Sequence, residues 1–179
     1  HDLKHQITRI RSMKNAQDDE LDKIENVIDQ YEMSSMTGNR TLDVTLAEKT
    51  MLCRKHNIQM TIMADGKALE FMSTADIAAL FGNALDNAIE CEYTIEDKEK
   101  RCITLDIHKK GNMLIIRLEN YCQNELKADT NFPETSKKDK YNHGFGLKSI
   151  HYIAEKYDGV VKIGVKNNIF ILSILFQVQ

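Results

Sequence analysis

The sequence predicts an α+β protein in which a helical hairpin precedes a layer of strands covered by helices. Two narrow apolar stripes at helical spacing occupy residues 1–31, and one broad apolar helical face occupies residues 75–93. Five short segments with strand-like patterns lie between residues 58 and 178. The 179 residues are enough to bury a core of one or two small domains.

Composition narrows the class of protein. The chain is 42% hydrophobic and 28% charged, which is typical of a globular domain, and its net charge is −3. It contains no basic run, so we expect no direct nucleic-acid partner. The four cysteines lack the spacing of a metal site and predict reduced thiols in a cytoplasmic domain: Cys53, Cys91, Cys102 and Cys122.

No apolar run is long enough to span a bilayer, and no signal peptide is present. The sequence opens at His1 without a methionine. We therefore expect a piece of a longer protein, in which a membrane segment could lie upstream.

The first 37 residues predict a helical hairpin that dimerises the chain. The apolar residues are Leu3, Ile7 and Ile10 on one helix and Leu21, Ile24, Ile28 and Tyr31 on the other. Stripes this narrow resemble the seam of a coiled coil rather than the face of a globular helix. Because two such helices cannot bury themselves alone, a second copy completing a four-helix bundle is expected.

The segment HDLKH at residues 1–5 has three interpretations. His1 and His5 lie one turn apart on one helix face, with Asp2 beside His1. They could form a zinc site, but no third ligand is evident. They could form a solvated polar face, which the spacing alone favours. Alternatively, His1 could be a nucleophile oriented by Asp2, as phosphohistidine chemistry requires.

A small polar stretch at residues 34–40 predicts a boundary, followed by a second domain over residues 41–179. Thr41 is expected to cap a helix that runs to about His56. Alternation of Ile58, Met60 and Ile62 then predicts a strand over residues 58–63.

The helix expected at residues 75–93 is the centre of the second domain. Its apolar positions recur at i, i+3, i+4 and i+7: Ile77, Leu80, Phe81, Ala84, Leu85, Ala88 and Ile89. Beside them runs a polar stripe of Asn83, Asn87 and Glu90. This stripe could hold a hydrated Mg2+ through its oxygens, or it could be the solvated edge of the helix.

The rest of the chain predicts two hairpins separated by a loop and a helix. The strands are expected at residues 103–108 and 113–119, and at 160–165 and 169–178 around Asn167-Asn168. The intervening polar loop, residues 121–143, is long enough to suggest a functional role. Gly144 and Gly146 open the helix that follows, where backbone N–H groups could meet phosphate.

The order of these segments resembles the sensor histidine kinases whose catalytic module has the GHKL ATP-binding fold, most closely the quorum-sensing AgrC and VirS type. HDLKHQI at residues 1–7 is similar to the H-box, GNALDNAIE at 82–90 to the N-box, and HGFGLKSI at 143–150 to the last glycine box. TSKKD at 135–139 is similar to the lid of that subfamily. The resemblance implies a dimerisation and phosphoacceptor hairpin followed by a GHKL-type α/β sandwich with a mixed sheet.

The resemblance also implies roles for individual residues. His1 would be the phosphoacceptor and Asp2 its acid–base partner. Asn87 would coordinate Mg2+, and Asn83 would line the phosphate side of the ATP site.

Further ATP-binding residues follow from the same resemblance. Gly144 and Gly146 would contact ATP through their backbone, next to Leu147, and Lys137 or Lys138 would reach the phosphates from the lid. Related kinases read adenine with an aspartate in a D-x-G-x-G box. Here ENYC at residues 119–122 takes that place, with Asn120 at the aspartate position and no glycines.

The function implied is ATP-dependent autophosphorylation of His1, followed by transfer to an aspartate of a response-regulator receiver domain, with ATP and Mg2+ as cofactors. The chain would be the cytoplasmic portion of a membrane-anchored bacterial sensor. One alternative is a degenerate nucleotide-binding or scaffold module that signals through dimer conformation, which the missing aspartate favours. Another is a different GHKL enzyme, an ATPase clamp or a protein-serine kinase, against which the His-Asp hairpin argues.

Overall fold

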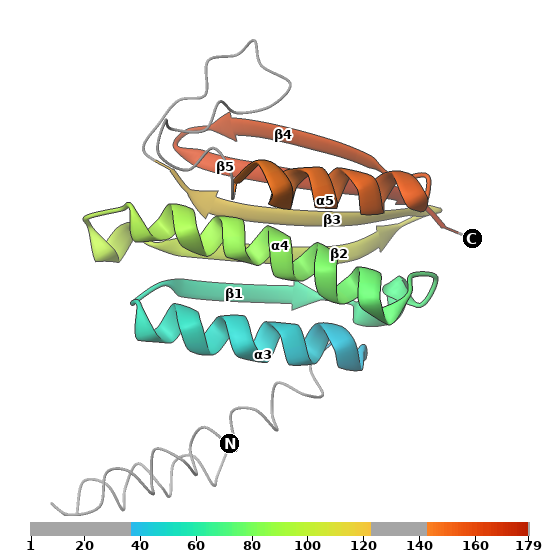
Figure 1. Cartoon of the computed structure of the whole chain (residues 1–179), viewed down its shortest axis with the longest axis horizontal. Coiled ribbons are helices and arrows are strands. Elements are labelled where there is room, and N and C mark those ends of the chain that lie inside the picture. The colour runs from blue at the N-terminus through green and yellow to red at the C-terminus, as the bar shows by residue number, and fades with distance from the viewer. Residues whose placement is uncertain (1–36, 123–142, 179) are drawn as a thin grey trace, which may run out of the picture.

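A computed structural model describes residues 37–122 and 143–178 (Figure 1). The helical hairpin predicted at residues 1–37 therefore lies outside the described residues, apart from Thr37, and so does most of the predicted loop. Across the described ranges, no helix is both long and apolar enough to cross a membrane.

A single mixed sheet forms one layer of the domain. Its order is β1-β2-β3-β5-β4, and its strands are β1 (Gln59–Ala64), β2 (Cys102–Lys110), β3 (Met113–Tyr121), β4 (Val160–Lys166) and β5 (Ile169–Gln177). Strands β1 and β2 are parallel, whereas the other three pairs are antiparallel. This sheet confirms the predicted α+β class and both predicted hairpins.

The helices form the second layer. They are α3 (Arg40–Lys55), α4 (Thr74–Tyr93) and α5 (His143–Lys156), with short 3-10 helices η1 (Gly66–Leu69) and η2 (Lys98–Lys100). Figure 1 shows α3, α4 and α5 lying beside one another on one face of the sheet. Every apolar α4 position predicted from the helical spacing is buried in this interface, from Ile77 to Ile89.

Helix α3 begins one residue before the predicted cap. Asn39 rather than Thr41 is the N-cap, and its side chain accepts a hydrogen bond from the Leu42 N–H at 3.1 Å. Thr41 lies inside the first turn, so the predicted cap position is wrong by two residues. Asparagine at position 39 has the extended backbone conformation and the side-chain oxygen that a cap requires.

The turn between β4 and β5 matches its sequence. Asn167 and Asn168 have φ values of 53° and 62°. Two successive residues with positive φ are typical of a type I′ turn, in which asparagine is favoured. This turn fixes the register in which β4 pairs with β5, with Lys166 opposite Ile169.

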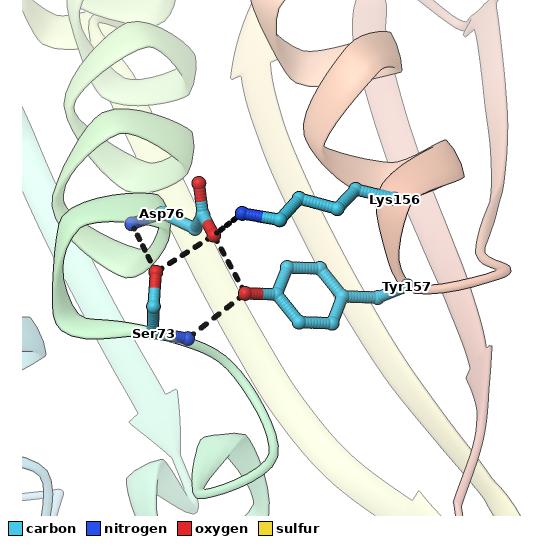
Figure 2. Close-up of polar contacts among 4 residues, drawn as sticks. All are labelled: Ser73, Asp76, Lys156 and Tyr157. Atoms are coloured by element: carbon cyan, nitrogen blue, oxygen red, sulfur yellow. Dashed lines mark hydrogen bonds and ion pairs between the residues drawn. The ribbon is translucent and has the colours of Figure 1, made fainter.

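A polar network joins the start of α4 to the end of α5 (Figure 2). Asp76 Oδ2 accepts hydrogen bonds from Lys156 Nζ at 2.7 Å, Tyr157 Oη at 2.6 Å and Ser73 Oγ at 2.7 Å. Tyr157 Oη in turn accepts the Ser73 N–H at 3.0 Å. The bonds from Lys156, Tyr157 and Ser73 hold the pKa of Asp76 well below its usual range.

We expect Asp76→Asn to destabilise the domain at neutral pH, with the effect disappearing in acid. A carboxyl whose pKa is depressed by folding stabilises the protein above its unfolded pKa, about 4, and loses that contribution as the pH falls. Urea unfolding from pH 7 to pH 2 should show the gap between wild type and variant closing below about pH 4. Asp158→Asn, at the exposed end of α5, is the control and should run parallel to wild type.

Gly82 offers a second prediction about stability. It lies in the middle of α4, and apart from its chain neighbours and the backbone of α4 itself no heavy atom lies within 4 Å of a Cβ added there. Because glycine inside a helix costs about 0.5–1 kcal/mol relative to alanine, Gly82→Ala should raise the free energy of unfolding by roughly that amount.

Gly66→Ala is the matched comparison, and it is expected to have the opposite effect on the free energy of unfolding. A Cβ at Gly66 would collide with the side chains of Thr37 and Asn39, so this substitution should destabilise the domain instead. If urea unfolding shows that both substitutions change the free energy of unfolding equally, the difference in packing between Gly82 and Gly66 is contradicted.

Candidate functional site

Two residues of the polar stripe predicted on α4, Asn83 and Asn87, face the first turns of α5. The two helices run antiparallel, since Asn87 lies at Gly146, Asn83 bonds to Ser149 and Asp76 bonds to Lys156. Asn87 and Gly146, which the sequence singled out on two separate helices, are thus brought together where α4 packs against α5.

The Asn87 side chain packs against Gly146. A Cβ added at Gly146 would lie 2.9 Å from Asn87 Oδ1 and 3.0 Å from Nδ2, so only glycine fits here without displacing the amide. Asn87 Nδ2 is buried and finds no hydrogen-bond partner among the described residues. A buried amide with unused bonding capacity is uncommon unless something else satisfies it.

Asn83 has a different environment from Asn87. Its Nδ2 donates a hydrogen bond to Ser149 Oγ at 3.1 Å. This bond links the middle of α4 to the first turns of α5, so Asn83 fixes the relative position of the two helices. Ser149 was not predicted; its position three residues after Gly146, on the same helix face, is the signal that could have found it.

Asn120 lies at the carboxyl end of β3 and is 3% exposed. Its Nδ2 donates a hydrogen bond to the Tyr121 carbonyl at 3.0 Å. The same carbonyl accepts a hydrogen bond from Cys91 Sγ at 3.7 Å. Burial raises the pKa of the Cys91 thiol to about 11, although a hydrogen bond from Asn120 lowers it, so Cys91 is a neutral thiol.

Glu92 is a functional candidate that the sequence analysis missed. It is fully buried, and its Oε1 accepts the Tyr121 N–H at 2.7 Å. Burial raises its pKa to about 7, against the lowering effects of backbone hydrogen bonds from Tyr121 and Cys102 and of the Arg101 charge. A signal was available, because position 92 continues the apolar α4 stripe at i+3 from Ile89 and a charged residue there is unusual.

The other predicted site residues divide into two groups. Gly144 and Leu147 lie in the first turns of α5, close in sequence to Gly146. His1, Asp2, Lys137 and Lys138 lie outside the described residues.

The described residues fit the predicted nucleotide and metal at one point. The Asn87 amide supplies an oxygen of the kind that Mg2+ prefers, it lies in the space that the missing side chain of Gly146 leaves, and its buried Nδ2 has no hydrogen-bond partner among the described residues. Within residues 37–122 and 143–178, no group of three or more His, Cys, Asp or Glu side chains is placed to hold a metal ion.

Comparison with known proteins gives one family match. A family model described as "GHKL domain" matches residues 72–177. A search of curated proteins found no match.

Several solved structures are similar in fold. The nucleotide-free catalytic domain of the histidine kinase ThkA has a TM-score of 0.60 and 16% identity, over 79% of this chain and 93% of that one. Histidine kinase AdeS of Acinetobacter baumannii has a TM-score of 0.55 and 11% identity, over 99% and 93%. The histidine kinase domain of the blue-light activated kinase EL346 from Erythrobacter litoralis has a TM-score of 0.53 and 14% identity, over 97% and 83%. At these identities the likeness concerns the fold alone.

Proposed function

This chain belongs to the GHKL domain family, and on that premise we propose that it is an ATP-dependent protein-histidine kinase that phosphorylates His1. GHKL domains bind ATP, and the fold is that of histidine kinase catalytic domains. The observation that carries the proposal is the contact between Asn87 and Gly146, because it joins the predicted N-box and glycine box in one site.

The residues of this site have complementary roles in the proposal. Asn87 would supply an oxygen ligand to Mg2+, and the backbone around Gly144 and Gly146 would approach the phosphates at the start of α5. Mg2+, when bound, neutralises charge on the phosphates. The positive end of the α5 dipole and the predicted lid lysines, Lys137 and Lys138, would add to that neutralisation.

His1 would act as the nucleophile. Its unprotonated ring nitrogen attacks the γ-phosphorus of ATP, a nitrogen–phosphorus bond forms, and the bond from phosphorus to the bridging oxygen breaks to release ADP. Asp2 would hold the other ring nitrogen in its N–H form. Most of the catalysis in such a transfer is alignment and charge stabilisation rather than covalent chemistry by the protein.

The proposal extends to partners that follow from the resemblance. The phosphoryl group would pass to an aspartate of a response-regulator receiver domain, and the chain would act as a homodimer through residues 1–37. We also propose the quorum-sensing subtype and a cytoplasmic location behind a membrane-bound sensor segment.

Incubation of the chain with γ-labelled Mg-ATP tests the proposal. We expect label on the protein that is lost in acid and kept in base, because phosphohistidine is acid-labile and phosphoserine is not. An acid-stable label would indicate a serine kinase, and release of phosphate without protein label would indicate an ATPase.

A nucleotide-binding scaffold is the second candidate, and Asn120 favours it. An uncharged amide stands where related kinases carry an aspartate, and its Nδ2 is bonded to the Tyr121 carbonyl. A chain that binds Mg-ATP but carries no label in the same experiment would support the scaffold and exclude the kinase.

A further inference from the structure

Glu92 is the one fully buried carboxyl-bearing side chain on the core face of α4, and the proposed chemistry gives it no role. Its neighbours along that face are apolar, ending with Ala88 and Ile89. A buried carboxyl is costly unless its hydrogen bonds compensate, so its presence in the core needs a reason.

The contacts of Glu92 lie at the end of β3 and at the start of β2, where the Cys102 backbone also bonds the carboxyl. Its Oε1 accepts the Tyr121 N–H at 2.7 Å, while Cys91, the preceding residue of α4, bonds the Tyr121 carbonyl. Two successive residues of α4 therefore hold both backbone polar groups of Tyr121. Asn120, whose Nδ2 bonds the same carbonyl, has its amide orientation fixed by this arrangement.

The end of β3 is also bonded within the sheet. The Cys122 N–H donates to the Asn168 carbonyl at 2.8 Å, in the turn between β4 and β5. Glu92 thus supplies the attachment to the helix layer, and Asn168 the attachment within the sheet.

We propose that Glu92 is a positioning residue for nucleotide binding, which orients Asn120 by anchoring the Tyr121 peptide. This inference rests on the proposed function, since it takes Asn120 to lie at the adenine end of an ATP site. An Asn120 side chain that is already oriented binds the adenine without the loss of entropy that ordering it would require. Removal of the Glu92 carboxyl should therefore weaken nucleotide binding.

The Glu92 carboxyl can accept the Tyr121 N–H in both of its protonation states. Burial raises its pKa to about 7. The ionised form gives the Tyr121 N–H a charge-assisted bond, which is stronger than the bond to a neutral carboxyl. Nucleotide affinity should therefore increase as the pH rises through 7.

Several ionisable groups surround Glu92 and belong in this argument. The charged group is Arg101, which precedes β2, and the thiols are Cys53 of α3, Cys91 of α4 and Cys102 of β2, with Cys122 beside Cys91 at the end of β3. Burial raises the pKa of Cys53 and of Cys91 to about 11, so these thiols remain neutral while Glu92 titrates.

Two substitutions separate the hydrogen bond from the packing. Glu92→Gln keeps an oxygen that can accept the Tyr121 N–H, whereas Glu92→Met fills similar space and accepts nothing. We expect Glu92→Met to weaken Mg-ATP binding about tenfold, the equivalent of one hydrogen bond. Glu92→Gln should bind Mg-ATP as tightly as wild type at pH 6, where the carboxyl with its pKa of about 7 is largely neutral. Glu96→Gln, an exposed carboxyl beyond α4, is the charge-matched control and should behave as wild type.

The measurements are Mg-ATP affinity by calorimetry from pH 6 to pH 8 and amide exchange at Tyr121 without nucleotide. The ratio of wild-type to Glu92→Gln affinity should rise through pH 7, because dividing by the variant removes the titration of ATP itself. A flat ratio would overturn the inference even if Glu92→Met fails to fold. Faster Tyr121 exchange in Glu92→Met with unchanged affinity would leave Glu92 a purely structural role.

The two proposals fail differently in this experiment. If wild type binds Mg-ATP and the Glu92 variants bind equally well at every pH, the inference falls and the proposed function stands. If wild type binds no Mg-ATP at any pH, the proposed function falls, and the role of Glu92 in nucleotide binding falls with it.

Discussion

Replacing Gly146 by alanine is expected to weaken Mg-ATP binding about a hundredfold and to abolish labelling of the chain. The added Cβ would lie 2.9 Å from Asn87 Oδ1, closer than real Cβ contacts, so the Asn87 amide or the start of α5 must move. Misplacement of a substrate-positioning group by roughly 1 Å can lower the rate of an oriented reaction about 10²-fold, and we expect a loss of similar size in binding. Calorimetry with Mg-ATP and the labelling assay measure the two losses.

A double-mutant cycle tests whether this loss acts through Asn87. Asn87→Ala alone should weaken Mg-ATP binding by at least as much as Gly146→Ala does, and Gly146→Ala added to it should have little further effect, because the side chain it displaces is gone. Gly164→Ala in β4 is the control, since no heavy atom outside the two neighbouring residues lies within 4 Å of a Cβ added there. Full Mg-ATP binding by Gly146→Ala would mean that this contact is not part of the nucleotide site.

Local patterns in the sequence predicted most of the fold that the structure describes. Helix α4 could be predicted because its apolar residues recur at helical spacing, and the β4–β5 turn because consecutive asparagines tolerate positive φ. The order of the strands depends on contacts between distant segments, so no local pattern contains it. The cap of α3 was missed because Thr41 and Asn39 are both good N-cap residues, and only the path of the chain from Thr37 decides between them.

The candidate site was predictable in its parts but not in its geometry. The sequence predicted Asn87 and Gly146 as members of two motifs, and the antiparallel packing of α4 on α5 is what brings them into contact. The sequence could not show that Asn83 would bond Ser149, because that bond joins positions 66 residues apart. Glu92 was overlooked because its neighbours are apolar, although a carboxyl in such a stripe is itself a signal.

Replacing His1 by glutamine is expected to remove all acid-labile label while leaving Mg-ATP affinity unchanged. Glutamine is polar and of similar length, but its amide is not a nucleophile. The assay should use a chain in which at least one further helical turn precedes His1, so that no free α-amino group lies beside the predicted acceptor. His5→Ala is the matched control: His5 lies one turn away on the same predicted helix face, and its loss should leave label on His1.

In the proposed mechanism, Asp2 orients the His1 imidazole as a nucleophile. Adjacent residues on a helix do not face each other, so Asp2 must reach sideways to the near ring nitrogen of His1. If it does, the far nitrogen stays unprotonated near neutral pH, and Asp2→Asn should slow labelling by about 10²-fold without changing Mg-ATP affinity. Labelling at the wild-type rate in Asp2→Asn would remove Asp2 from the mechanism. A His1→Gln chain that keeps its acid-labile label would show that another histidine is the acceptor.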